Sequence, residues 1–187
     1  MTKGTSVIRM LHNYLGAERF QKALASYIRK YTNSNAKTDD LWAVLDEKSG
    51  QPIRNMMATW TKQQGYPVIN ATLEGNYLEL EQPQFLLNGS SGSGMWIVPV
   101  TLGCGSYDMQ KNFLLKGKIE KLDIKKITSQ CDNQENGGNL WIKLNINQTG
   151  FYRVKYDDEL AAALQNALRA KKLSLMDKIS KHDMQHC

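Results

Sequence analysis

The chain changes character within the stretch Trp60-Thr61-Lys62-Gln63-Gln64-Gly65-Tyr66-Pro67-Val68-Ile69. Before this stretch, apolar residues recur every three or four positions, as they do on one face of a helix. After it, they alternate or form short β-branched and aromatic runs, as they do in strands. Glycine often ends a helix in the left-handed conformation, while proline cannot continue a helix and disfavours the helical conformation of the residue before it. Gly65 and Pro67 therefore predict that a helical part ends here and a β part begins.

Four helices are predicted before this boundary. Apolar stripes at helical spacing run through residues 5–15 and 17–31, which a glycine separates. A third helix is expected to start at Thr38, whose hydroxyl is a good cap, and to end at Gly50. Pro52 suits the first turn of a fourth helix, where its missing N–H is not needed. The stripes could line a groove for a peptide, but ordinary helix–helix packing is the favoured interpretation.

Short strands separated by polar turns are predicted after the boundary. Residues 68–73 and 77–81 should form a hairpin around a turn at 74–76. Pro99 lies in the next predicted strand, residues 96–102, and indicates an edge position or a bulge there. The remaining predicted strands are residues 112–115, 119–124, 141–145 and 151–156. About seven short strands with polar turns are typical of a small β-sandwich.

A last helix is predicted after the strands. Asp157 and Asp158 open it, because acidic side chains suit the positive end of the helix dipole. Leu160, Leu164 and Leu168 share its apolar face. The expected fold class is therefore α+β: an N-terminal α-helical part, a small antiparallel β-sandwich and a short C-terminal helical segment.

The composition favours a globular protein without a nucleic-acid site. Hydrophobic residues make up 41% of the 187 residues and charged residues 22%, which suits a packed core with a polar surface. The net charge of +6 is scattered along the chain. Its densest part, from Lys111 to Lys126, holds six lysines among apolar and acidic residues. A solvated strand face is favoured there over a nucleic-acid patch.

Cysteine usage and targeting signals favour the cytoplasm. The three cysteines, at positions 104, 131 and 187, form no CxxC pair and are too few for a disulfide framework, so we expect reduced thiols. Glycosylation sequons begin at Asn70, Asn88 and Asn147, but they matter only in a secreted protein. No signal peptide and no apolar run long enough to span a bilayer is apparent.

Three short motifs imitate functional sites. His182 and His186 are four residues apart with an acid between them, as in a zinc-binding HExxH helix, but no third ligand follows in a plausible helix. The glycine-rich residues 89–94 lack the Lys-Ser/Thr ending of a phosphate loop and precede a strand, so a plain linker is favoured. Residues 151–153 could stack on bases, but a buried structural strand is the favoured interpretation.

The helical part resembles the end of the catalytic domain of zinc aminopeptidases of the HExxH (gluzincin) class, especially the puromycin-sensitive type. The segments that carry this resemblance are Lys3-Gly4-x-x-Val7-Ile8-x-Met10-Leu11, Tyr14-Leu15-Gly16 with Phe20, Asp40-Leu41-Trp42, Ser49-Gly50 and Trp60-Thr61-x-Gln63-x-Gly65-Tyr66-Pro67.

The later part resembles the next two domains of the same family. Trp141-x-Lys143-Leu144-Asn145 and Gly150-Phe151-Tyr152-Arg153-Val154-x-Tyr156 are similar to the end of its β-sandwich domain, and Leu173-Ser174-x-x-Asp177-Lys178 to the start of its C-terminal helical domain. The resemblance implies three domains: residues 1–66 as the helical end of a thermolysin-like catalytic domain, 67–156 as the β-sandwich, and 157–187 as the start of the helical domain.

The family's catalytic motifs are missing from this sequence. The resemblance implies a zinc ion held by two His of an HExxH helix and a distant Glu, and a Gly-Ala-Met-Glu-Asn segment that binds the amino terminus of the peptide substrate. Neither motif occurs here, and Met1 occupies the position of a tyrosine that stabilises the oxyanion. No catalytic, substrate-binding or metal-ligating residue is therefore assigned, and no zinc is expected in this chain.

Two functions remain open at this stage. The chain could be a fragment of a cytoplasmic zinc aminopeptidase that releases N-terminal residues from peptides, and be inactive alone. It could instead be a non-catalytic interaction module from a truncated gene product. Either way, the apolar stripes of the helical part are expected to lack partners and to favour self-association; their members are Met10, Tyr14, Phe20, Tyr27, Trp42 and Trp60.

Overall fold

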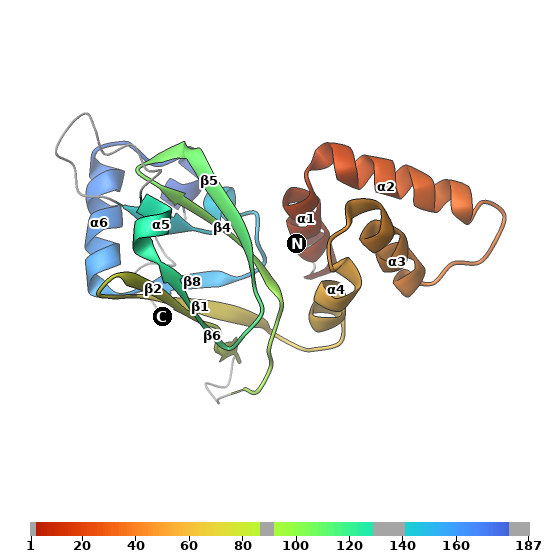
Figure 1. Cartoon of the computed structure of the whole chain (residues 1–187), viewed down its shortest axis with the longest axis horizontal. Coiled ribbons are helices and arrows are strands. Elements are labelled where there is room, and N and C mark those ends of the chain that lie inside the picture. Colours follow the sequence, from red (N-terminus) through yellow and green to blue (C-terminus); the bar gives the residue numbers. More distant parts are fainter. Residues whose placement is uncertain (1–2, 87–91, 129–140, 180–187) are drawn as a thin grey trace.

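The computed structural model describes residues 3–86, 92–128 and 141–179, and it has two parts that lie side by side (Figure 1). The first is the helical half, residues 3–61, which contains four helices. The second is the β half, residues 66–156, in which two sheets pack over a shared core. Two more helices follow. The helices of the helical half are α1 Lys3–Leu15, α2 Ala17–Lys30, α3 Thr38–Ser49 and α4 Ile53–Thr61.

Glycines set the helix ends much as the sequence predicts. Gly16 (φ 80°) separates α1 from α2, and Gly50 (φ 65°) ends α3 in the left-handed conformation. Thr38 is the first residue of α3 and not its cap. The backbone N–H of the preceding Lys37 donates to the Asp40 carboxylate over 2.8 Å, so an acid of the first turn performs the capping.

The boundary stretch differs from its prediction in one respect. Gly65 has the expected left-handed backbone, with φ of 76°, but α4 already ends at Thr61. Gly65 instead lies where the chain enters the first strand. A Cβ atom there would come within 3.0 Å of the Phe85 carbonyl oxygen, so the position requires glycine both for its backbone and for space.

The β half contains two sheets. One sheet has the order β3-β1-β2-β6, with β8 paired to β1, and the other has the order β5-β4-β7. The strands are β1 Tyr66–Glu74, β2 Tyr77–Glu81, β3 Gln84–Phe85, β4 Val98–Cys104, β5 Ser106–Leu115, β6 Ile119–Asp123, β7 Ile142–Leu144 and β8 Arg153–Tyr156. The predicted β1–β2 hairpin is present, with Glu74 opposite Tyr77. The strand pairs of the described residues are antiparallel except β1 with β8, which is parallel.

Pro99 lies on a locally open side of the central strand β4. β5 pairs with β4 along its length and meets Pro99 at Leu114, whereas β7 pairs only with residues 102–104. Among the described strands, none pairs with the other side of β4 at Pro99, which has no N–H to donate. The bulge of β4 lies at Gly103/Cys104, so the edge interpretation of Pro99 is the better one.

Apolar residues from both sheets and from the helical half form one core. Ile69, Leu78 and Leu80 come from the first sheet, and Val98 and Val100 from the second. Met10, Trp42 and Trp60 of the helical half belong to the same cluster and are 2%, 4% and 1% exposed. The expectation that these three side chains lack partners is therefore wrong, because they pack within the chain itself.

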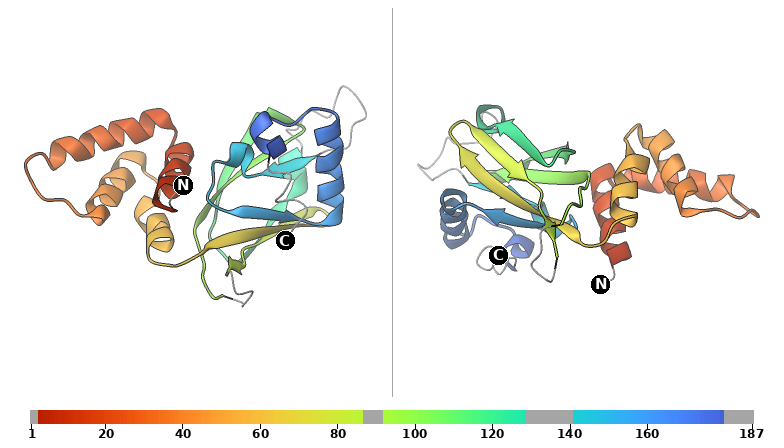
Figure 2. Two further views of the ribbon diagram at one scale, coloured as in Figure 1. Left: turned by 180° about the vertical axis from the view of Figure 1, so that it is seen from behind. Right: turned by 90° about the horizontal axis from the view of Figure 1, so that it is seen from below.

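The segment after the strands is tied to the β half by its first residue. Asp157 caps α6 (Asp158–Arg169) by accepting from Leu160 N–H at 2.8 Å, and its other oxygen accepts from Leu73 N–H in β1 at 2.6 Å. One carboxylate thus starts the helix and attaches it to the sheet. α6 lies on the side of the β half that faces away from α1–α4 (Figure 2). A short helix, α7 (Leu175–Ile179), follows.

One cysteine differs from expectation, and one sequon residue lies within a sheet. Cys104 is disulfide-bonded, so the predicted reduced thiol is wrong at this position. The sequon residue Asn70 lies in β1, between β2 and β8, and its side chain donates to Glu81. No helix within residues 3–86, 92–128 and 141–179 is both long and apolar enough to cross a membrane.

Candidate functional site

Within the part of the chain that the structure describes, side chains of α4, Gln63 and Gln82 bind the segment Met95-Trp96-Ile97, which leads into β4. We call this segment and the side chains that bind it the junction. Gln63 holds Met95: its Nε2 donates to the Met95 carbonyl over 2.6 Å, and its Oε1 accepts from the Met95 N–H over 3.3 Å. A side-chain amide thus pairs with both backbone groups of one residue.

Trp96 and Ile97 are held in the same manner. Gln82 donates to the Trp96 carbonyl and accepts from the Trp96 N–H, both over 2.9 Å. Thr59 Oγ1 accepts from the Ile97 N–H over 3.1 Å, and Trp60 Nε1 donates to the Ile97 carbonyl over 2.9 Å. Three consecutive residues therefore have their backbone N–H and C=O groups satisfied by side chains. Pairing of this kind matters most at Trp96, which is buried, whereas Met95 is 51% exposed.

Most of these groups come from α4 and the residues that directly follow it. Thr59 and Gln63 are four residues apart, so they share a helix face that continues past the last turn. Gln63 Nε2 also donates to the Thr59 carbonyl over 2.7 Å, which orients the amide. Lys3 at the start of α1 donates to the Gln63 carbonyl over 2.6 Å, and its partial burial lowers the pKa of its ammonium.

Aromatic rings fill the space behind the junction. Trp60 lies 6.1 Å from Trp96 and 6.2 Å from Phe151, measured between ring centroids. The Phe151 N–H points to Met10 Sδ over 3.4 Å, which joins α1 to the last strand region. Tyr152, the next residue, is buried, and this burial raises the pKa of its phenol. Of residues 151–153, Tyr152 is buried and Phe151 packs against Trp60, but Arg153, the first residue of β8, is exposed, so the buried-strand interpretation holds only in part.

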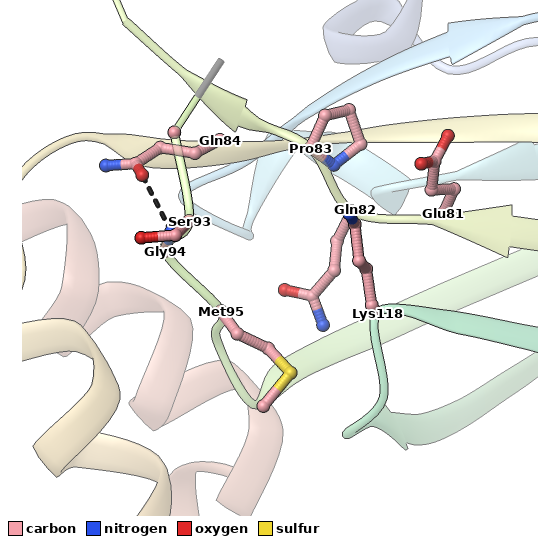
Figure 3. A pocket seen from close by; sticks show the side chains of 9 residues that line it. Glu81, Gln82, Pro83, Gln84, Ser93, Gly94, Met95 and Lys118 are labelled. Atoms are coloured by element: carbon pink, nitrogen blue, oxygen red, sulfur yellow. Dashed lines mark hydrogen bonds between the residues drawn. The ribbon is translucent and has the colours of Figure 1, made fainter.

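A cavity of about 530 Å³ lies beside the junction (Figure 3). Its lining includes the charged side chains Glu81 and Lys118, and Met95 at the edge. Gln84 crosses one wall, where its Oε1 accepts from the Gly94 N–H over 2.8 Å. This glycine-rich wall continues in sequence into residues 87–91, which the structure does not describe, so the cavity supports no assigned site.

A buried ionic cluster joins the β half to α7. Lys143 and Asp177 are almost fully buried, and Lys143 Nζ lies 3.7 Å from Asp177 Oδ1. The Asp177 carboxylate also accepts from the Asn147 N–H over 3.0 Å and from Ser174 Oγ over 3.2 Å. Asn147 has a left-handed backbone with φ of 54°, which directs its N–H to the carboxylate. Two segments that carried the family resemblance therefore meet in this cluster.

The described residues do not fit a zinc site. Within residues 3–86, 92–128 and 141–179, no group of three or more His, Cys, Asp or Glu side chains is placed to hold a metal ion. His12 packs edge-on against the ring of Phe20, with centroids 5.1 Å apart. His182 and His186 lie outside the described residues, as do residues 89–91 of the glycine-rich run at 89–94.

Comparisons with known proteins place the chain in a family. Residues 1–60 match the Peptidase family M1 domain. The chain is 70% identical over 184 residues to aminopeptidase M1-C of Oryza sativa subsp. japonica, covering 98% of this chain and 21% of that relative. This chain belongs to the M1 aminopeptidase family. It is 55% identical over 180 residues to aminopeptidase M1 of Arabidopsis thaliana, covering 94% of the chain and 20% of that relative.

The M1 relationship extends beyond plants. The chain is 36% identical over 184 residues to puromycin-sensitive aminopeptidase of Caenorhabditis elegans, covering 94% of the chain and 18% of that relative. The chain spans about a fifth of the length of these M1 relatives. The resemblance inferred from the sequence motifs is confirmed.

One junction residue could have been found from the M1 chain's own sequence. Leu78, Leu80 and Gln82 occupy alternate positions, so they point to the same face of the strand. All three are buried. A glutamine that continues an apolar alternation indicates a buried amide with fixed partners. Its partner Trp96 could not have been named, because no local pattern links positions 14 residues apart.

Proposed function

We propose that this chain is the joining piece of an M1 aminopeptidase, which connects the end of the catalytic domain to the following β domain and is inactive alone. The observation that carries the proposal is the position of the junction. The M1 domain match ends at residue 60, within α4, and Thr59, Trp60 and Gln63 bind the segment that opens β4. The junction thus fixes the last matched helix on the β half.

The domain limits in this proposal are residues 1–66, 67–156 and 157–187. The β half supports the second domain because two sheets share one core, as a β-sandwich does. Asp157 and the Lys143–Asp177 cluster support a third unit that begins against the sandwich. For the intact enzyme we propose zinc as cofactor, peptides as substrates and the cytoplasm as location, following the family resemblance.

Zinc content and activity of the purified chain test the proposed inactivity. The sequence contains no HExxH motif, so neither stoichiometric zinc nor release of an N-terminal amino acid is expected. An intact M1 relative, assayed with the same aminoacyl substrate, serves as positive control. One tightly held zinc ion per chain together with chelator-sensitive hydrolysis would contradict the proposal.

A second candidate function is a non-catalytic interaction module. An apolar groove on the helical half favours it, since Val7, Ile8 and Trp42 line an open hollow of about 270 Å³. The two candidate functions predict different transcripts. An in-frame HExxH motif ahead of Met1 would favour the enzyme, whereas translation that starts at Met1 would favour the module.

A further inference from the structure

We propose that the disulfide at Cys104 is a reversible redox switch that controls how firmly β7 and α6 are held on the β half. The inference goes beyond the proposed joining role, and it rests on the proposed function only for the cytoplasmic location. Cys104 is the last residue of β4, is 2% exposed and is disulfide-bonded. The sequence has two other cysteines, Cys131 and Cys187, both outside the described residues, so the bond pairs Cys104 with one of them.

A disulfide is unusual for the proposed location. In the cytoplasm, glutathione and thioredoxin keep most thiols reduced, and the disulfides that do form there are mainly transient, catalytic or redox-sensing. Three cysteines are too few for a framework of structural disulfides. A single bond in a cytoplasmic chain therefore favours a reversible link over a permanent one.

Cys104 lies where β7 joins its sheet. It pairs with Ile142 in β7, and the next residue, Gly105, donates its N–H to the Trp141 carbonyl over 3.2 Å. β7 has three residues, and among the described strands only β4 pairs with it. Few backbone hydrogen bonds therefore hold β7. A covalent restraint at Cys104 acts at the point where this strand is attached.

The attachment of α6 depends on the same place. Trp141, directly before β7, forms a small apolar cluster with residues of α6 and of the segment after it, namely Leu164, Ala167 and Leu173. Along the sequence, Cys131 is ten residues before Trp141, and Cys187 is eight residues after the end of α7. A bond from Cys104 to either cysteine restricts the chain that flanks β7, α6 and α7, because it closes a loop.

Opening the bond requires a dithiol reductant, such as proteins of the thioredoxin class. One thiolate of the reductant attacks a sulfur of the disulfide and forms a mixed disulfide, while the other cysteine of the chain leaves as a thiolate. The second thiol of the reductant then displaces the attacked cysteine. The chain gains two electrons and two protons and ends with two thiols, and the reductant ends as a disulfide.

The reduced chain should remain folded. Val98, Val100 and Leu102 of β4 are buried in the core that both sheets share. A Cys104 thiol can keep its buried position as a small apolar side chain. Reduction should therefore loosen β7 and α6 without unfolding the β half. The junction lies at the opposite end of β4 and should keep its hydrogen bonds.

Thiol mapping of the purified chain tests the bond. After equilibration with oxidised glutathione, alkylation of the denatured chain without reduction should label one of its three cysteines. Peptide mapping should find Cys104 linked to Cys131 or Cys187 of the same chain. The bond should open in glutathione mixtures as reducing as the cytoplasm. Three labelled cysteines, a link between two chains, or a bond that stays closed in those mixtures would each overturn the proposal.

Hydrogen exchange of the oxidised and the reduced chain tests the control of β7 and α6. Amides of both elements should exchange about tenfold faster after reduction, whereas those of residues 95–97 should not change. Cys104→Ala should give the fast rates in either condition. The matched control is an alanine variant of the cysteine that mapping finds outside the bond, which should respond to reduction as the unmodified chain does.

Two results of the exchange experiment would overturn the proposal. One is equal exchange of β7 and α6 in both redox states. The other is faster exchange that includes residues 95–97, which would indicate general unfolding. If Cys104→Ala fails to fold, the reduced unmodified chain still provides this comparison. None of these results bears on the proposed inactivity, which is decided by zinc content and hydrolysis of the chain alone.

Discussion

At the scale of single residues, glutamine side chains replace backbone pairing where β4 begins. A glutamine amide offers one acceptor and two donors, so it can pair with the N–H and C=O of one residue as a neighbouring strand would. Gln82 does so for Trp96 and also donates to the Gly117 carbonyl over 2.7 Å. Gln82 and Trp96 are both buried, so water cannot readily substitute for the amide.

Gln82→Ala should lower the free energy of unfolding by about 2–5 kcal/mol, because it leaves two buried backbone groups of Trp96 without partners. Gln84→Ala is the matched control. Its amide also bonds to backbone groups, at Gly94 and Gln64, but it is only partly buried and water can replace it. We expect Gln84→Ala to lower the free energy of unfolding, measured with urea, by less than about 1.5 kcal/mol. Equal losses would show that the Gln82 pairing is not special.

Gly65→Ala should be more destabilising than Gly75→Ala. Both glycines have a left-handed backbone, with φ of 76° and 59°, so alanine is strained by about 1–3 kcal/mol at either site. Only at Gly65 would the new Cβ also meet the Phe85 carbonyl oxygen at 3.0 Å; at Gly75 nothing lies within 4 Å. Chemical denaturation measures how much each substitution lowers the free energy of unfolding. The difference between the two decreases gives the cost of this contact alone. A larger loss for Gly75→Ala would contradict the assignment.

At the scale of elements, the sequence predicts those structures that local patterns specify. The four helices follow from apolar periodicity, and their ends at Gly16 and Gly50 follow from backbone freedom. The β1–β2 hairpin follows from alternation and its turn. In contrast, β3 is only two residues long and is defined by its pairing with Tyr66 and Pro67. No local sequence pattern predicts that contact. The short helix α5, Ile124–Thr128, was missed because its first residue reads as the end of a strand.

The junction was only partly predictable for the same reason. Trp60 and Gln63 appear in the motif that carried the family resemblance, but their targets lie 37 and 32 residues away. The parallel pairing of β1 with β8 likewise joins Val68 to Arg153 across most of the β half. Spacing along a sequence specifies which face a side chain occupies. It does not specify which distant backbone that face will meet.

The buried Lys143–Asp177 pair should control how α7 attaches to the β half. Lys143→Met leaves the Asp177 carboxylate buried with its hydrogen-bond donors but removes the Lys143 ammonium, which should cost about 3–5 kcal/mol. Combining Lys143→Met with Asp177→Asn removes both charges, so part of the loss should be recovered. Urea unfolding of the single and double variants measures this. Strictly additive losses would show that the two charges do not interact.

At the scale of the whole molecule, the two halves are not independent bodies. Met10, Trp42 and Trp60 share one apolar cluster with both sheets of the β half. The junction adds hydrogen bonds from α4 to Ile97 and from Gln63, just after α4, to Met95. Helices that share a core and a hydrogen-bond network with a sheet should open together with it. The expectation that the apolar stripes of the helical half lack partners therefore needs revision.

Amide exchange rates should differ from helix to helix within the helical half. They should not differ simply between the helical half and the β half. In α2 only Ala23 is buried, and Ile28 is 59% exposed, so few contacts oppose its opening. In α4, by contrast, Ile53, Met56, Met57 and Trp60 are all buried, and Trp60 bonds to Ile97. Amides of α2 should exchange first, and those of α4 at the slow rate of β4, because opening α4 must also expose the junction.

Exchange followed by mass spectrometry on the purified chain distinguishes the alternatives. A Thr59→Val variant, which removes the acceptor of the Ile97 N–H but keeps the side-chain shape, should speed exchange in both α4 and β4. Its effect on α2 should be small, since α2 holds no junction residue. If α4 exchanges as fast as α2 in the unmodified chain, the junction does not couple the halves. The helical half would then open as a unit of its own, and the joining role proposed here would lose its structural basis.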